Sequence, residues 1–241
     1  MTDTIFFDLD NTLLDFNRAE RTALSKTLEA LGVPPAEDLL HRYSQLNAAQ
    51  WRLLEQGKLT RPEVKLRRFR LLFAEYGIPA APGEAAKIYE SHLGVGHFFM
   101  EGAEELLEAL AGKYRLYLVT NGTAAVQKGR IESAGLKNRF AGIFISEEVG
   151  FDKPDPAFFR YCFGQIPGFR KENAVIVGDS LTSDIKGGLG VGLRTIWFNP
   201  SHAANTTDIV PDHEIHRLLD LPLYLCGQEA GPVTAAGLCT G

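Results

Sequence analysis

A short apolar run near the N-terminus ends in two aspartates, and this feature constrains the fold more than any other. Residues 5–14 read Ile-Phe-Phe-Asp-Leu-Asp-Asn-Thr-Leu-Leu. A short apolar run bounded by polar residues is typical of a buried strand. The carboxylates of Asp8 and Asp10 are costly to place at the end of a core strand unless a cation or a reaction uses them. The segment therefore predicts a buried strand that delivers acidic side chains to a functional site.

The second half of the chain alternates between helical and strand patterns. The predicted strands are Tyr114 to Thr120, Ala141 to Ser146, Ala174 to Val177 and Arg194 to Phe198. The predicted helices are Ala103 to Ala111, Ala124 to Ala134, Pro156 to Phe163 and Thr182 to Gly190. This alternation predicts the α/β class, with a parallel sheet wrapped by helices.

A purely helical block interrupts this pattern after the first strand. Its predicted helices are Arg18 to Leu31, Asp38 to Gln56, Arg61 to Tyr76 and Ala85 to Leu93. Thr60 and Glu63 have the spacing of a capping box at the start of the third. We therefore expect a discontinuous core of residues 1–14 and 99–226, and an inserted helical cap of residues 15–98. The tail, residues 227–241, is rich in Gly, Ala and Thr and is predicted to be disordered.

Composition narrows the choice of partner. The chain has 241 residues and a formal net charge of −5, which provides no basic surface for a nucleic-acid polymer or a membrane. The cysteines, Cys162, Cys226 and Cys239, lack metal-ligand spacing and are expected to be reduced thiols. Met-Thr-Asp-Thr does not resemble a signal peptide, and no apolar stretch is long enough to span a bilayer. These features favour a cytoplasmic protein.

Polar residues follow several of the predicted strands. The segments are Asp8 and Asp10, Thr120-Asn121-Gly122, Lys153-Pro154, and Gly178-Asp179 followed by Asp184. Each has an ordinary alternative when taken alone, as a turn, a surface lysine or a helix cap. Ligands bind at the carboxyl ends of strands in open parallel sheets, so the order of the segments favours one shared site.

The combined set suits phosphoryl chemistry. The carboxylates of Asp8, Asp179 and Asp184 are hard oxygen ligands of the kind that Mg²⁺ prefers, and Mn²⁺ suits the same oxygens. Phosphate oxygens could be bound by the Thr120 hydroxyl, the Asn121 and Gly122 amides and the Lys153 ammonium group. Asp8 could then attack phosphorus, and Asp10 could serve as general acid and base.

These motifs resemble those of the haloacid dehalogenase (HAD) superfamily. The matching residues are Asp8-Leu9-Asp10-Asn11-Thr12, Thr120, Lys153-Pro154 and Gly178-Asp179 through Asp184. The resemblance implies a Rossmann-like core, Mg²⁺ and an aspartyl-phosphate intermediate. It implies that Asp8 is the nucleophile and that Asp10 is the general acid/base. It also implies that the Asp10 backbone carbonyl is a metal ligand. True dehalogenases of this superfamily generally lack the second aspartate, so Asp10 favours a phosphatase. A Schiff-base mechanism would need an activated cap lysine, and no sequence feature activates one.

Other segments, less specific than the four catalytic motifs, resemble the pyrimidine 5′-nucleotidase-like branch, which carries an inserted helical cap. They include Leu46-Asn47 through Trp51, residues 56–60, Arg68-Phe69, residues 119–123 and residues 145–150. Asn47 and Trp51 share one helical face and could contact a nucleobase, and Phe16 lies at the hinge. The alternative for Trp51 is the cap core. Arg52, Arg67, Arg68 and Arg70 are expected to face solvent, and the role of Asp152 stays open.

The leading hypothesis is a Mg²⁺-dependent phosphatase. Its expected substrate is a small phosphorylated metabolite, namely a nucleoside 5′-monophosphate. One alternative is a phosphatase for phosphoglycolate or a sugar phosphate. Another is a regulatory binding module on the same fold, although every catalytic residue of the pattern is present.

Overall fold

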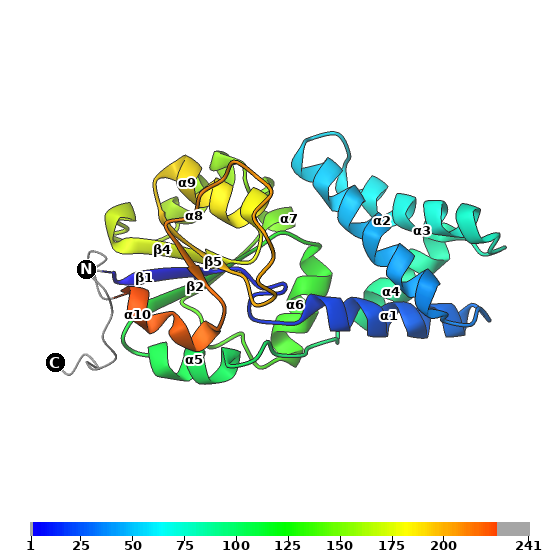
Figure 1. The fold of residues 1–241 in the computed structure, drawn as a ribbon, viewed down its shortest axis with the longest axis horizontal. Coiled ribbons are helices and arrows are strands. Elements are labelled where there is room, and N and C mark those ends of the chain that lie inside the picture. The colour runs from blue at the N-terminus through cyan, green and yellow to red at the C-terminus, as the bar shows by residue number, and fades with distance from the viewer. Residues whose placement is uncertain (1, 226–241) are drawn as a thin grey trace.

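A central parallel sheet organises residues 2–225, which are the residues that the computed structural model describes. Within this range the sheet has six strands in the order β3-β2-β1-β4-β5-β6, and every neighbouring pair is parallel. The strands are β1 (Thr4–Phe7), β2 (Arg115–Thr120), β3 (Gly142–Ile145), β4 (Ala174–Gly178), β5 (Arg194–Phe198) and β6 (His213–Ile215). This topology confirms the predicted α/β class (Figure 1).

Helices cover both faces of this sheet (Figure 1). They are α5 (Ala103–Leu110), α6 (Ala124–Ser133), α7 (Ser146–Val149), α8 (Pro156–Gly164), α9 (Lys186–Val191) and α10 (Pro222–Leu225). The alternation of side chains along β1 explains how one strand serves both faces. Ile5 and Phe7 belong to the buried cluster that includes α5, whereas Phe6 belongs to the cluster that includes α8.

The central position of β1 decides where the site lies. Phe7 is in register with Leu118 of β2 and with Val177 of β4. The Asp8 backbone N–H continues this pattern by donating to the Val177 carbonyl at 2.9 Å. The carboxyl ends of β2, β1 and β4 are therefore adjacent, and the residues that follow them converge.

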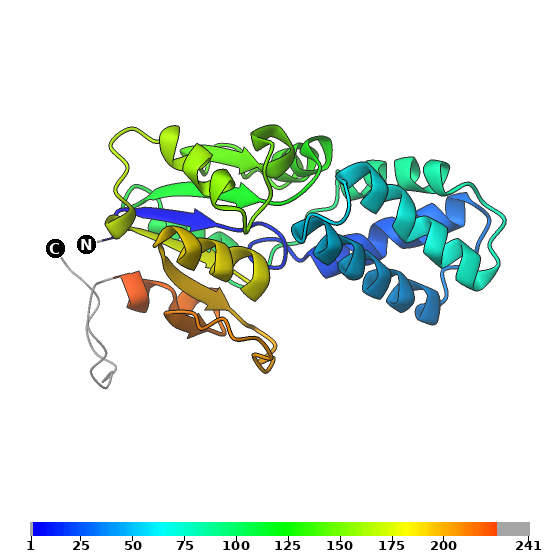
Figure 2. The ribbon, with the colours of Figure 1, turned by 90° about the horizontal axis from the view of Figure 1, so that it is seen from above.

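Four helices between β1 and α5 form a group beside the sheet (Figures 1 and 2). They are α1 (Phe16–Ala30), α2 (Glu37–Glu55), α3 (Arg61–Tyr76) and α4 (Pro82–Leu93). Their apolar faces enclose a separate buried cluster that includes Leu28, Tyr43 and Phe69. We call this group, with its linkers, the α1–α4 block.

Two adjacent linkers join the α1–α4 block to the sheet. The Asp15 N–H donates to the Phe98 carbonyl at 2.7 Å, and the Met100 N–H donates to the Leu13 carbonyl at 2.9 Å. The outgoing and returning chains therefore lie side by side. A relative movement of the block would involve both linkers.

Some details differ from the sequence predictions. The predicted helix at 182–190 begins as a π-helical turn, Leu181–Ile185, before α9. The sequence analysis did not predict β6, α7 or α10, which have three or four residues each and offer too little periodicity to detect. As predicted, the Glu63 carboxylate accepts from the Thr60 N–H at 2.7 Å.

Several sequence predictions concern residues outside this range. The predicted tail at 227–241, Cys226 and Cys239 lie beyond the described residues. Cys162 is buried as a free thiol. Among the helices of residues 2–225, none combines the length and hydropathy that a membrane span requires.

Candidate active site

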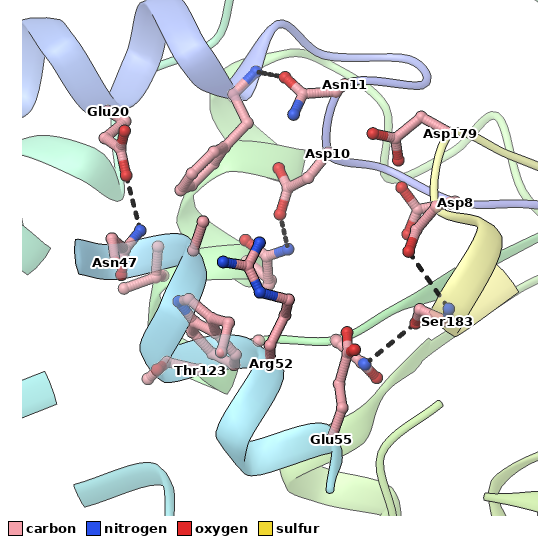
Figure 3. A pocket seen from close by; sticks show the side chains of 18 of the residues that line it. Asp8, Asp10, Asn11, Glu20, Asn47, Arg52, Glu55, Thr123, Asp179 and Ser183 are labelled. Atoms are coloured by element: carbon pink, nitrogen blue, oxygen red, sulfur yellow. Dashed lines mark hydrogen bonds between the residues drawn. The ribbon is translucent and has the colours of Figure 1, made fainter. Parts of the chain in front are cut away.

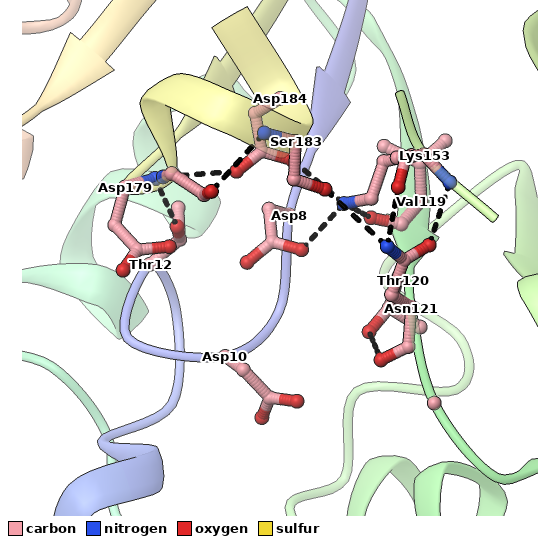
Figure 4. Close-up of polar contacts among 12 residues, drawn as sticks. Asp8, Asp10, Thr12, Val119, Thr120, Asn121, Lys153, Asp179, Ser183 and Asp184 are labelled. Atoms are coloured by element: carbon pink, nitrogen blue, oxygen red, sulfur yellow. Dashed lines mark hydrogen bonds and ion pairs between the residues drawn. The ribbon is translucent and has the colours of Figure 1, made fainter. Parts of the chain in front are cut away.

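Asp8 lies directly after β1 (Figure 4), and a constrained turn follows it. The side chain of Asp8 is buried, whereas that of Asp10 is partly exposed. Asn11 adopts a left-handed conformation with φ of 59°, which Asn tolerates better than most residues. Its side-chain oxygen accepts from the Phe16 N–H at 3.0 Å. The turn therefore ties the aspartates to the start of α1.

Lys153 is the cation at the centre of the site. Its Nζ atom lies 2.7 Å from Asp8 Oδ1 and 2.7 Å from Asp184 Oδ1, and it donates to the Val119 carbonyl at 2.8 Å. Burial disfavours the charged ammonium group, but the carboxylates of Asp184 and Asp8 outweigh this effect. The pKa of Lys153 is consequently above its ordinary value. Lys153 is 1% exposed and remains a fixed positive charge inside the protein.

Asn121 holds the backbone of Lys153 in place. Its side-chain oxygen accepts from the Lys153 N–H at 2.8 Å, and its amide nitrogen donates to the Lys153 carbonyl at 2.8 Å. The strand end after β2 thus positions the loop that carries the lysine. The Asn121 side chain has this structural role in addition to the phosphate contact predicted for its backbone.

Three carboxylates converge beside Lys153. Ligand oxygens of Asp8, Asp179 and Asp184 all lie within 4.8 Å of one another. Gly178 permits this approach, because a Cβ atom at that position would lie 2.3 Å from Asp184 Cγ. The Ser180 N–H donates to Asp184 Oδ2 at 3.1 Å and orients that carboxylate.

The electrostatics of the three carboxylates favour an added cation. Burial, followed by repulsion from Asp8 and Asp184, raises the pKa of Asp179 well above its ordinary value. Burial also raises the pKa of Asp8 to about 7, although the Lys153 ammonium group opposes the shift. One ammonium group does not neutralise three carboxylates. The oxygen-only donor set therefore fits a divalent metal ion.

The phosphate-binding candidates after β2 lie within the same region. Thr120 is buried, and its hydroxyl accepts from Gln127 Nε2 at 2.7 Å. The Gly122 N–H donates to the hydroxyl of Ser146, the first residue of α7, at 3.1 Å. The sequence analysis named Ser146 only as the end of a predicted strand and within residues 145–150, and gave it no role of its own.

The Asp152 carboxylate pairs with Arg61, the first residue of α3. The same Arg61 Nη2 atom donates to the Ser146 hydroxyl at 2.8 Å. This contact answers the question that the sequence left open for Asp152. The carboxylate links the lysine loop to the α1–α4 block.

Asp10 is held by two residues that the sequence analysis missed. Gln127 Nε2 donates to Asp10 Oδ2 at 2.9 Å, and Arg130 Nη1 pairs with Asp10 Oδ1. Both partners lie on α6, three positions apart. The only signal that could have predicted their role is the pattern itself, two polar residues three positions apart on a helix face that is otherwise buried.

A cavity of about 450 Å³ joins the strand ends to the α1–α4 block (Figure 3). Its lining includes Asp8, Asp10, Lys153 and Asp179, together with the predicted substrate residues Phe16, Asn47 and Trp51. Trp51 is only partly buried and is not a member of the buried cluster of the block. The structure therefore places Trp51 at the cavity rather than in the core.

Asn47 belongs to a buried polar network at the same end of the cavity. Its amide nitrogen donates to Glu20 Oε1 at 2.6 Å (Figure 3), and its oxygen accepts from Arg68 Nη1 at 3.0 Å. The expectation of solvent exposure is wrong for Arg68, which is 3% exposed, and holds for Arg52, Arg67 and Arg70. Arg68 is accommodated because Asn47 accepts from it and the Tyr89 ring lies 4.6 Å away.

The chain is similar to several known proteins. The model of the haloacid dehalogenase-like hydrolase family matches residues 2–192. The chain is similar to the HAD-hydrolase YfnB of Bacillus subtilis, with 42% identity over 90% of this chain and 93% of that protein. A crystal structure of YfnB bound to magnesium has 41% identity and a TM-score of 0.89, and the match covers 93% of this chain and 99% of that one.

Two further relatives are named pyrimidine 5′-nucleotidases. PynA of Streptococcus pneumoniae is 39% identical over 90% of this chain and 92% of its own length. YjjG of Escherichia coli is 30% identical over 93% of this chain and 98% of its own length.

Proposed function

The chain belongs to the haloacid dehalogenase-like hydrolase family, and on this basis we propose that it is a Mg²⁺-dependent phosphatase. Its proposed substrates are nucleoside 5′-monophosphates, which it hydrolyses through an aspartyl-phosphate on Asp8. The observation that carries the proposal is the position of Lys153 Nζ, 2.7 Å from both Asp8 and Asp184. A buried carboxylate nucleophile there lies beside a cation that can bind the transferred phosphoryl group.

Asp10 supports a phosphatase over a dehalogenase. A phosphate monoester leaves as an alkoxide, which needs a proton, whereas a halide does not. Asp10 lines the same cavity as Asp8 and is partly exposed, so a leaving oxygen could reach it.

The proposed reaction has two halves. An Asp8 carboxylate oxygen attacks phosphorus, the ester P–O bond breaks, and protonated Asp10 gives its proton to the leaving oxygen. Asp10 then takes a proton from a water molecule, whose oxygen attacks the phosphorus of the aspartyl-phosphate. The Asp8–phosphorus bond breaks and releases phosphate, which restores Asp8 as a carboxylate and Asp10 as an acid.

Phosphate oxygens would be bound by the Thr120 hydroxyl, the backbone amides of Asn121 and Gly122, and the Lys153 ammonium group. The Gly122 amide donates to Ser146 in this structure, so binding would exchange that acceptor for a phosphate oxygen. This exchange costs little, because the Ser146 hydroxyl is also within hydrogen-bond distance of Arg61.

Mg²⁺ would be held by the side chains of Asp8, Asp179 and Asp184 and by the backbone carbonyl of Asp10. When bound, it would neutralise the repulsion among these carboxylates and between them and the phosphoryl group. The convergence of the three side-chain carboxylates within 4.8 Å supports this assignment.

We propose that residues 15–98 form a cap on a core of residues 1–14 and 99–226. The paired linkers at Asp15 and Phe98 support this boundary. Phe16, Asn47 and Trp51, which line the cavity from the cap side, would contact the leaving group. Similarity to relatives named pyrimidine 5′-nucleotidases supports a nucleotide as the leaving group. The cytoplasmic location stays a prediction from the sequence.

The test is phosphate release from nucleoside monophosphates, sugar phosphates and phosphoglycolate, with Mg²⁺ and with EDTA. We expect metal-dependent release with a preference for a pyrimidine monophosphate. A preference for a sugar phosphate or phosphoglycolate would keep the chemistry and replace the substrate. Absence of release from every compound with Mg²⁺ present would favour the binding-module alternative.

The nucleophile can be tested by Asp8→Asn, which we expect to lower kcat by at least about 10³-fold while leaving the circular dichroism spectrum unchanged. An amide oxygen is a poor nucleophile, and its acyl-phosphate analogue does not form. The matched control is Asp208→Asn, an exposed position that should retain wild-type kcat. Substantial turnover by Asp8→Asn would rule out the covalent mechanism.

A further inference from the structure

A buried polar pair on α6 has no role in the chemistry described so far. Gln127 is 2% exposed and Arg130 is fully buried, although both side chains are polar. They are three positions apart on α6, so they project from the same side of the helix. Burying an arginine is costly unless its charge is paired, so its partners indicate why it is there.

The shared partner of this pair is the carboxylate of Asp10. Gln127 Nε2 donates to Oδ2 at 2.9 Å, while Arg130 Nη1 pairs with Oδ1. Arg130 Nη1 also donates to Gln127 Oε1 at 3.2 Å, which fixes the two side chains relative to each other. Each oxygen of Asp10 therefore has its own donor, and this arrangement defines the plane of the carboxylate.

Gln127 also links Asp10 to the phosphate-binding region. The same Nε2 atom donates to the Thr120 hydroxyl at 2.7 Å. A Cβ atom on Gly122 would lie 2.8 Å from Gln127 Cγ, so the glycine leaves room for this side chain. The proposed acid/base and the proposed phosphate ligand thus share one amide.

Arg130 contacts both linkers of the α1–α4 block. Its Nε atom donates to the carbonyl of Gly96, in the returning linker, at 3.1 Å. Its guanidinium carbon lies 5.5 Å from the ring centre of Phe16, where the outgoing linker enters α1. Arg130 Nη2 has no hydrogen-bond partner among residues 2–225, so one donor is available when the contacts rearrange.

We propose that Arg130 and Gln127 are positioning residues for Asp10, and that Arg130 couples the Asp10 carboxylate to the linkers of the cap. The inference rests on the proposed function, in which Asp10 protonates the leaving oxygen. A general acid acts only when its oxygen is within hydrogen-bond reach of that atom. A shift of either linker would move Arg130, and the paired carboxylate would move with it.

The experiment compares two esters, a nucleoside monophosphate and p-nitrophenyl phosphate, in the full-length chain. The nucleoside alkoxide needs a proton to leave, whereas p-nitrophenolate hardly does. We expect Arg130→Met to lower kcat/KM about 10²-fold for the nucleotide and less than about 5-fold for p-nitrophenyl phosphate. Arg130→Lys, which keeps the charge, should recover part of the loss. Arg139→Met, at an exposed position outside the site, is the control and should match the wild type.

A double-mutant cycle with Asp10→Asn separates positioning from a general structural effect. Arg130→Met should add no more than about twofold to the loss already caused by Asp10→Asn. Equal losses for the two esters, or losses that multiply in the double variant, would overturn the inference. The inhibition constant of inorganic phosphate should stay unchanged, because the phosphate ligands are retained.

Gln127→Met provides a second route if Arg130→Met does not fold. It removes the donor to Asp10 Oδ2 and keeps the side-chain length, and it should show the same difference between the two esters. Equal losses for the two esters in this variant would also overturn the inference. Failure of the proposed function is seen separately, as a wild-type chain that hydrolyses neither ester. Failure of this inference alone is seen with an active wild type.

Discussion

The buried charges around Lys153 lower the stability of the protein. One buried ammonium group faces Asp8 and Asp184, while Asp179 lies close to both carboxylates. Such an arrangement is expensive to bury, because like charges repel strongly where water is excluded. Clusters of this kind are concentrated at functional sites, where a ligand relieves the repulsion.

Asp179→Asn is expected to separate stability from metal binding. Burial and the neighbouring Asp8 and Asp184 raise the pKa of Asp179, so the ionised form of this carboxyl group destabilises the metal-free fold. In EDTA the free energy of unfolding of the variant should be no more than about 1 kcal/mol below that of the wild type. With Mg²⁺ at about 100 times its Kd, the wild type should gain about 2.7 kcal/mol and the variant much less.

Urea denaturation at pH 7.5, with Mg²⁺ or EDTA, measures both effects. Asp208→Asn serves as the exposed control and should gain as much from Mg²⁺ as the wild type. An equal gain for Asp179→Asn would show that Asp179 does not bind the metal.

Trp51→Ala tests the leaving-group contact. Loss of a ring that stacks on a base should raise KM for the preferred nucleotide about 10-fold, while KM for a small phosphate ester changes less than about twofold. Steady-state kinetics on both substrates measures the difference, with Tyr161→Ala, an exposed aromatic on α8, as the control.

Asn47→Ala should show the same difference with an added loss of stability, because Glu20 and Arg68 lose their buried partner. Equal effects on both substrates would refute these contacts.

Helix α6 connects three environments within ten residues. Val126 belongs to the buried cluster of the α1–α4 block, Arg130 reaches the active site, and Ile131 packs in the sheet core. Its backbone also approaches the returning linker closely. A Cβ atom on Gly129 would lie 2.5 Å from the Gly94 carbonyl oxygen. The glycine is therefore required by packing rather than by backbone conformation.

Gly129→Ala is expected to destabilise the protein by about 1–3 kcal/mol, because helix and linker have to separate to admit the methyl group. Gly164→Ala in α8 is the matched control, since a Cβ atom there meets nothing within 4 Å. The control should be neutral or stabilising by up to about 1 kcal/mol, as expected for alanine in a helix. Urea denaturation of both variants measures the difference, and equal midpoints would contradict the proposed packing role.

The cavity lies between the α1–α4 block and the strand ends of the sheet. These two parts of the molecule also contact each other at the edge of the cavity. Arg61, at the start of α3, pairs with Asp152 and donates to the Ser146 hydroxyl. On another side of the opening, Thr182 donates to Glu55 Oε2 at 3.3 Å. These contacts hold the α1–α4 block over the strand ends. Under the proposed function, a block held in this position would exclude water from the reacting groups.

Arg61→Met should weaken this closed arrangement. We expect KM for the preferred nucleotide to rise about 3- to 10-fold, in line with the loss of roughly one kcal/mol from a partly exposed ion pair. Small-angle X-ray scattering should show a larger radius of gyration. The control is Arg42→Met, which removes an ion pair with Glu75 inside the α1–α4 block. A variant with unchanged KM and unchanged scattering would show that Arg61 does not hold the block in place.

The sequence predicted most of the fold because the relevant signals are local. The apolar run before Asp8 and the helical spacing from Arg61 to Tyr76 gave elements close to those observed. The converging strand ends followed from the rule for parallel sheets. Short edge elements such as β6 were not predicted, because a segment of only three residues that includes a charged side chain shows no detectable periodicity.

The amino-acid sequence by itself determined which groups are available for chemistry, since Asp8, Lys153 and Asp179 sit within recognisable local motifs. Only the tertiary structure decided which partners these groups have. Arg130 lies 120 positions from Asp10, and Asp152 lies 91 positions from Arg61, so no local pattern could pair them. Chain folding brings such residues together through packing of the whole molecule, and the environment of each side chain is a property of that packing.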